Sequence, residues 1–166
     1  DDDVQGSPGS FHMYGLTNQK AAPPSDFDED GLPDSWEIRI VDNLEDLNGN
    51  GAGPGPGSGT GDFDGDGLTD LDEFEETGTD PTKADTDEDG LSDGVETNTG
   101  TFVSATNTGT DPKKADTDSD GLIDSVETNT GVLVDEENTG TSPHNRDSDG
   151  DGYGDAGEIS GGTDPN

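Results

Sequence analysis

Residues 85–96 read DTDEDGLSDGVE, and this twelve-residue pattern decides how the chain folds. The pattern D-x-D-x-D-G-x-x-D-x-x-E occurs five times, at 26–37 (DFDEDGLPDSWE), 62–73 (DFDGDGLTDLDE), 85–96, 116–127 (DTDSDGLIDSVE) and 147–158 (DSDGDGYGDAGE). We call these segments loops 1 to 5 and number the positions in each from 1 to 12. Such self-similarity predicts a repeat architecture in which each unit mainly contacts its neighbours.

Each loop has the residue types of a calcium-binding loop. Aspartates at positions 1, 3 and 5 point inward when the chain curls around a cation, and Gly at position 6 permits the sharp reversal. Position 7 offers its backbone carbonyl, position 9 a direct or water-mediated ligand, and Glu at position 12 two oxygens. These hard oxygen ligands favour calcium over magnesium, which retains waters, and over zinc or copper, which prefer His or Cys. We expect about five Ca²⁺ ions, one in each loop.

The predicted ligands are the carboxylates at positions 1, 3, 5, 9 and 12 and the backbone carbonyl at position 7. By loop they are Asp26, Asp28, Asp30, Leu32, Asp34 and Glu37; Asp62, Asp64, Asp66, Leu68, Asp70 and Glu73; Asp85, Asp87, Asp89, Leu91, Asp93 and Glu96; Asp116, Asp118, Asp120, Leu122, Asp124 and Glu127; and Asp147, Asp149, Asp151, Tyr153, Asp155 and Glu158.

The composition shows why metal is needed. Of 166 residues only 22% are hydrophobic, whereas Asp and Glu number 42 against 6 Lys and Arg, for a net charge of -36. A chain of this composition buries little core, and without another source of stability it would be disordered. Since 25 of the 42 acidic residues occupy predicted ligand positions, metal binding accounts for most of the acidity.

Charge and residue content also exclude several functions. A charge of -36 repels nucleic-acid phosphates and anionic membranes, and no apolar stretch is long enough to span a bilayer. The absence of Cys excludes disulfides and thiolate sites. His12 and His144 lie in no catalytic motif and are expected to face solvent, and calcium would occupy the acidic pairs that a glycosidase needs, so we expect no enzyme.

Four segments follow one another along the chain. Residues 1–25 contain a strand-like segment or the end of a preceding domain, 26–47 loop 1 and a helix predicted over 34–47, 48–61 a Gly/Pro linker, and 62–166 the tandem loops. Connectors GTDP (78–81 and 109–112) and GTSP (140–143) are typical of type I turns. Because residues 162–166 repeat the connector, we expect the array to continue beyond residue 166.

The loops differ from an ordinary EF-hand. Gly, Thr and Pro precede loops 3 to 5 where an entering helix would stand, and TNTG at 97–100 and 128–131 limits the exit helices. The expected fold class is an irregular, calcium-stabilised repeat array, mostly loops with short helical turns, a candidate short β-hairpin and little core.

The motif D-x-D-x-D-G-L-x-D-x-x-E joined by GTDP connectors resembles the bacterial form of the thrombospondin type 3 repeat over residues 26–166, apart from the linker. The resemblance implies an extracellular array wrapped around calcium ions. Animal members use disulfides, which this chain lacks.

Two functions are consistent with these features. The first is a calcium-binding structural or spacer segment of a secreted or cell-surface protein, including one that self-assembles into a filament or surface layer or carries glycans. The alternative is a calcium-dependent docking or adhesion module of a larger secreted protein, which the uneven spacing of the five loops disfavours.

Removal of calcium is expected to unfold the array, because each loop then holds five carboxylates that repel one another. Excess chelator at neutral pH should increase the radius of gyration in small-angle scattering and abolish hydrogen-exchange protection. Chelator pre-saturated with calcium is the control. An unchanged radius and unchanged protection after complete calcium removal would contradict the prediction.

Overall fold

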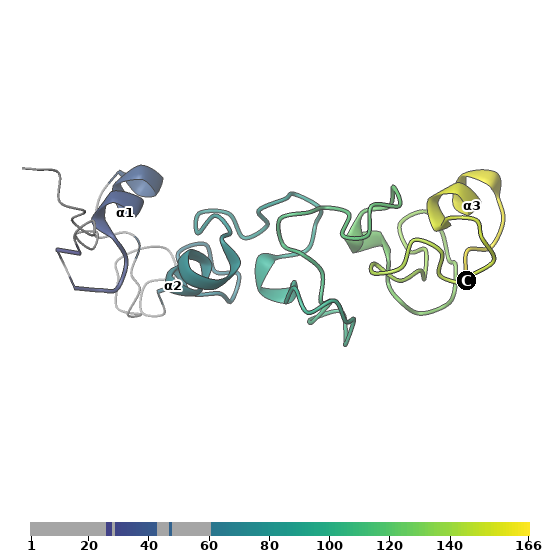
Figure 1. Ribbon diagram of the computed structural model, residues 1–166, viewed down its shortest axis with the longest axis horizontal. Helices are drawn as coiled ribbons and strands as arrows, with labels where there is room; N and C mark the ends of the chain where they lie inside the picture. Colours follow the sequence, from purple (N-terminus) through teal and green to yellow (C-terminus); the bar gives the residue numbers. More distant parts are fainter. Residues whose placement is uncertain (1–25, 28, 43–46, 48–60) are drawn as a thin grey trace, which may run out of the picture.

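The computed structural model describes residues 26–27, 29–42, 47 and 61–166, which form an elongated row of loop units (Figure 1). Helix α1 lies toward one end of the row and helix α3 at the other. The predicted N-terminal segment, nearly all of the Gly/Pro linker and the predicted ligand Asp28 lie outside the described residues.

Every loop ends in a short helical turn that begins at its position 9. These turns are α1 (Asp34–Val41), α2 (Asp70–Asp72), the 3₁₀ turns η2 (Asp93–Val95) and η3 (Asp124–Val126), and α3 (Asp155–Gly161); the π-helical turn η1 (Glu73–Thr77) continues α2. The residue at position 8 is extended in each loop, with ψ between 128° and 152°, so the chain turns sharply into the helix. The aspartate at position 9 is the first residue of each turn. Its negative charge is favourable there because the N-terminal end of a helix carries a partial positive charge.

Helix α1 is shorter than the sequence predicts. It ends at Val41 because Asp42 adopts the left-handed conformation (φ 63°) and its N–H bonds to the Ile38 carbonyl. The prediction of a helix as far as Leu47 is therefore wrong, although Leu47 itself is fully buried.

The described residues contain no β-strand, so the candidate β-hairpin is absent from them. Two short loops, residues 100–109 and 131–140, leave the array and return to it, and we call them excursions. In the first, Gly100 N–H donates to the Gly109 carbonyl and an isolated bridge joins Ser104 to Asn107. The second repeats this pattern 31 residues later, from Gly131 to Gly140. Repeats with little regular secondary structure are thus confirmed.

The interior of the array is polar. In the described residues, Leu32 and Leu47 are the buried large hydrophobic side chains, whereas sixteen Asp, Glu and Thr side chains are buried. Burial of so many acidic groups stabilises nothing by itself, since each ionised carboxylate loses its hydration. The fold therefore depends on whatever neutralises them.

Consecutive connectors are joined by a repeated contact. The side chain that follows the connector Pro reaches a Thr carbonyl at the preceding connector: Lys113 Nζ donates to Thr77, His144 Nε2 lies 2.9 Å from Thr108, and Asn166 Nδ2 lies 2.8 Å from Thr139. The expectation that His144 faces solvent is wrong, because this contact leaves it half-buried.

The connectors themselves are turns, as predicted. Lys83 N–H bonds to the Asp80 carbonyl, and Lys114 N–H bonds to the Asp111 carbonyl. In the described part of the chain, no helix has the length and apolar character needed to cross a bilayer.

Gly94 of loop 3 lies close against the backbone of loop 2 at Asp66. A Cβ at Gly94 would overlap the Asp66 carbonyl, whereas a Cβ at Gly157, inside α3, would have open space. We expect Gly94→Ala to destabilise the calcium-loaded protein by about 1–3 kcal/mol through overpacking. Gly157→Ala should raise stability slightly, because Ala favours a helix. Denaturant unfolding in saturating calcium measures both; equal effects of the two substitutions would contradict the prediction.

Candidate metal centre

The aspartate at position 1 closes each loop by accepting backbone hydrogen bonds. In loop 4, Asp116 Oδ1 accepts from Ser119 N–H (2.6 Å) and Oδ2 from Gly121 N–H (2.9 Å). Asp62, Asp85 and Asp147 accept equivalent bonds in loops 2, 3 and 5. The pattern D-x-D-x-D-G thus produces a curled backbone with its carboxylates held on the inside.

The aspartates at positions 1, 3 and 5 converge. Carboxylate oxygens lie within 4.8 Å of one another in three such sets: Asp62, Asp64 and Asp66; Asp85, Asp87 and Asp89; and Asp116, Asp118 and Asp120. In loop 1, the structure describes Asp26 and Asp30, and Asp30 N–H donates a hydrogen bond to Asp26 Oδ1 (3.2 Å). Loops 2 to 4 therefore bring their first three predicted ligands together.

The aspartate at position 9 fastens the two ends of its loop. Asp124 Oδ1 accepts from Thr117 N–H (2.8 Å) and Oδ2 from Thr117 Oγ1 (2.7 Å), and Asp93 and Asp155 bind Thr86 and Ser148 in the same way. Asp34 and Asp70 accept from the N–H at position 2 of their own loops. These hydrogen bonds hold the aspartate side chain at position 9 in one orientation.

The same aspartates reach the preceding loop. Asp124 forms a buried cluster with Asp89 and Glu96 of loop 3. Asp155 forms a similar cluster with the half-buried Asp120 and the buried Glu127 of loop 4, with oxygens again within 4.8 Å. Each cluster thus combines positions 5 and 12 of one loop with position 9 of the next.

The glutamate at position 12 is held by a connector threonine. Thr110 Oγ1 donates to Glu96 Oε1 (2.9 Å), and Thr141 Oγ1 donates to Glu127 Oε1 (3.0 Å). In loop 2 the same bond runs from Thr79 to Glu73 (3.0 Å). The sequence interpretation missed these threonines, although their recurrence in the Gly-Thr-x-Pro connectors is a signal that could have identified them.

The second oxygen of these glutamates is buried and accepts no hydrogen bond from any residue that the structure describes. Glu96 and Glu127 are each 2% exposed, and their Oε2 atoms have no hydrogen-bond donor; the same holds for Oδ2 of Asp89 and Asp120. An unpartnered buried acceptor is costly, and several acceptors pointing at one another are costlier still. An oxygen-seeking cation at these points satisfies all of them, so the residues fit calcium.

Burial changes the acidity of these groups in the metal-free fold. Loss of hydration raises the pKa of Glu127 and of Glu73 to about 9 and that of Glu96 to about 8. Burial together with the neighbouring carboxylate at position 5 raises the pKa of Asp64 to about 7 and of Asp118 to about 6. In the metal-free fold, burial therefore opposes ionisation of the glutamates at position 12.

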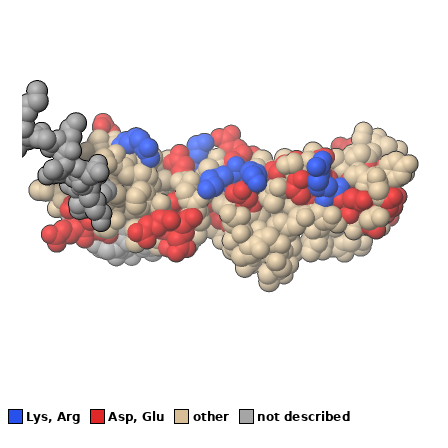
Figure 2. Space-filling model, in the orientation of Figure 1, with Lys and Arg blue, Asp and Glu red and all other residues tan. Residues whose placement is uncertain are grey.

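Acidic groups also cover much of the outside. Asp and Glu lie along the length of the face in Figure 2, with a few Lys and Arg side chains between them. Two ion pairs, Lys83–Glu88 and Lys114–Asp111, lie in the described part of the chain. Both lysines and Glu88 are exposed and Asp111 is half-buried, so the pairs lie at the surface and contribute little. Protein cations therefore leave the acidic clusters of the described loops largely uncompensated.

Comparison with known proteins gives one family. The model of the bacterial thrombospondin type 3 repeat matches residues 62–84, 85–101 and 147–166. No curated protein and no solved structure matches the chain.

The raised pKa values predict opposite pH dependences with and without calcium. In the metal-free fold these groups contribute stability that is fully present below the unfolded values near 4.5 and is lost as pH rises through about 8–9. Calcium needs the ionised form, so the calcium-loaded fold should instead lose stability as pH falls toward about 4.5. Small-angle scattering between pH 4 and pH 8, in chelator and in saturating calcium, measures both: the chain in chelator should expand as pH rises, and the calcium-loaded chain should expand as pH falls. The same pH dependence in both conditions would contradict the prediction.

Proposed function

Since the chain contains bacterial thrombospondin type 3 repeats, which are calcium-binding modules, we propose that it is a calcium-stiffened spacer of a secreted or cell-surface protein. The observation that carries the proposal is the joining of neighbouring loops by shared carboxylate clusters. A cation bound in such a cluster joins two neighbouring loops, so it limits the motion of one loop relative to the next.

Each loop is assigned one calcium ion, held by the carboxylates at positions 1, 3, 5, 9 and 12 and the carbonyl at position 7. The carboxylates that the structure describes at positions 1, 3 and 5 of loops 2 to 4 support this assignment. The clusters of Asp89, Glu96 and Asp124 and of Asp120, Glu127 and Asp155 are candidates for further ions between loops. Bound calcium supplies positive charge and open coordination positions to oxygens that lack a donor.

An extracellular location follows from the affinity expected of such sites. Calcium sites of extracellular modules commonly have dissociation constants of about 10⁻⁴–10⁻³ M and are filled only where calcium is abundant. A filament or surface layer is the assembled form that a stiff repeat array would serve. Electron microscopy of the calcium-loaded protein tests for fibres, and fractionation of the source cells tests the location.

Stiffness can be measured directly because the chain has no native Cys. Spin labels on Cys introduced at the exposed positions Thr82 and Ser160 should give a narrow distance distribution in calcium and a broad one in chelator. Glu127→Gln should broaden the distribution in calcium and reduce the number of bound ions, because it removes charge from the boundary between loops 4 and 5.

Glu137→Gln is the matched control, since Glu137 is exposed and lies in an excursion away from the clusters. It should leave the distance distribution and the ion count unchanged. A distribution that is equally broad with and without calcium would refute the spacer, even if the ions bind.

A further inference from the structure

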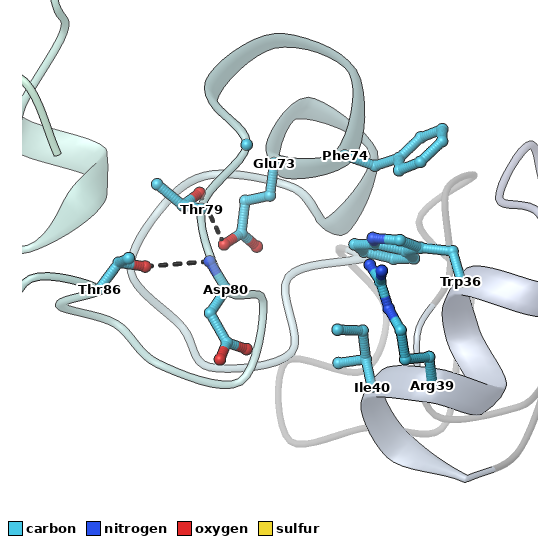
Figure 3. Close-up of a pocket in the computed structure, with 9 residues that line it drawn as sticks. Trp36, Arg39, Ile40, Glu73, Phe74, Thr79, Asp80 and Thr86 are labelled. Atoms are coloured by element: carbon cyan, nitrogen blue, oxygen red, sulfur yellow. Dashed lines mark hydrogen bonds between the residues drawn. The ribbon is translucent and has the colours of Figure 1, made fainter. Parts of the chain in front are cut away.

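A pocket of about 420 Å³ lies where helix α1 meets the second repeat (Figure 3). Its apolar lining is formed by Trp36, Ile40 and Phe74, and its polar lining includes Arg39, Asp80 and Thr86. This volume is within the range of about 300–1,000 Å³ typical of small-molecule sites.

The two aromatic rings form one wall. Trp36 comes from α1 and Phe74 from η1, and their ring centroids lie 5.0 Å apart at an interplanar angle of 57°. Phe74 is 37% exposed, so the rings are not closed off by the described residues. Aromatic faces that remain open bind apolar surfaces of ligands.

The polar groups of the pocket are held in place. Asp80 Oδ1 accepts from Thr82 Oγ1 (2.7 Å), and Asp80 N–H donates to Thr86 Oγ1 (3.0 Å). Arg39 forms no ion pair with another described residue. Glu73 also lines the pocket, but it is fully buried and, under the proposed function, is assigned to the calcium ion of loop 2. One available carboxylate, Asp80, and one guanidinium, Arg39, therefore line the pocket beside the rings.

We propose that this pocket binds a neutral saccharide. A sugar ring has an apolar C–H face for Trp36 or Phe74 and hydroxyl groups that donate to Asp80 and accept from Arg39. The net charge of -36 disfavours an anionic ligand, and one guanidinium beside one available carboxylate leaves no excess negative charge in the pocket to select a cationic one. A neutral, polyhydroxylated ligand satisfies both the aromatic and the charged groups.

The chain has a single Trp, so its fluorescence reports on this pocket alone. In saturating calcium, the intact chain is titrated with glucose, galactose, mannose, N-acetylglucosamine and chitotetraose, with choline and a heparin oligosaccharide as charged probes. At least one neutral saccharide should change the Trp36 emission saturably, and saturation-transfer NMR should show contact with its C–H protons.

Asp80→Asn should weaken this binding roughly tenfold or more, because it replaces a charged hydrogen-bond acceptor with a neutral one that still accepts from Thr82. Asp111→Asn is the matched control: Asp111 has the same place in the next connector, away from the pocket, and the substitution should leave affinity unchanged. Calcium stoichiometry, measured on both variants, separates loss of this pocket from failure of the metal sites. Binding of choline or heparin alone, or of no probe, would overturn the proposal.

Discussion

The structure depends on the neutralisation of buried carboxylates. In most domains burial of apolar surface offsets the entropy lost on folding. Here the buried positions of the described repeats belong mainly to Asp, Glu and Thr, and burial raises the pKa of the central glutamates. A cation among these oxygens would convert an unfavourable contribution to folding into an interaction that holds each loop closed, so we expect metal binding and folding to be coupled.

The remaining contacts are arranged around that interaction. A connector threonine such as Thr110 orients one oxygen of Glu96 and leaves the other for the cation. The residue after the connector Pro then reaches back to the preceding connector, as Asn166 does to Thr139. Each of these hydrogen bonds contributes only modestly to the free energy of folding. Together they hold the glutamate at the boundary between two loops.

Much of this arrangement can be predicted from the sequence, and the reasons for the rest are physical. The spacing of Asp116, Asp118 and Asp120 is sufficient to predict that they converge, because a Gly at position 6 curls the chain locally. The contact of Asp124 with Glu96 could not be predicted in this way, since it depends on how one loop packs against the next. The end of α1 at Val41 was missed because helical spacing does not reveal the left-handed conformation of Asp42.

The uneven spacing of the loops follows from the same logic. Loops 2 and 3 begin 23 residues apart and loops 3 and 4 begin 31 residues apart, yet position 10 of the later loop contacts position 5 of the earlier one in both pairs: Gly94 N–H donates to Asp66, and Ser125 Oγ donates to the Asp89 carbonyl. The eight additional residues lie between Glu96 and Gly109, in an excursion closed by the bond from Gly100 to Gly109. Because the excursion returns to its starting point, it adds length to the chain without separating the acidic clusters. The contact between neighbouring loops therefore tolerates eight additional residues between position 12 and the connector, because these residues leave and rejoin the array at the same place.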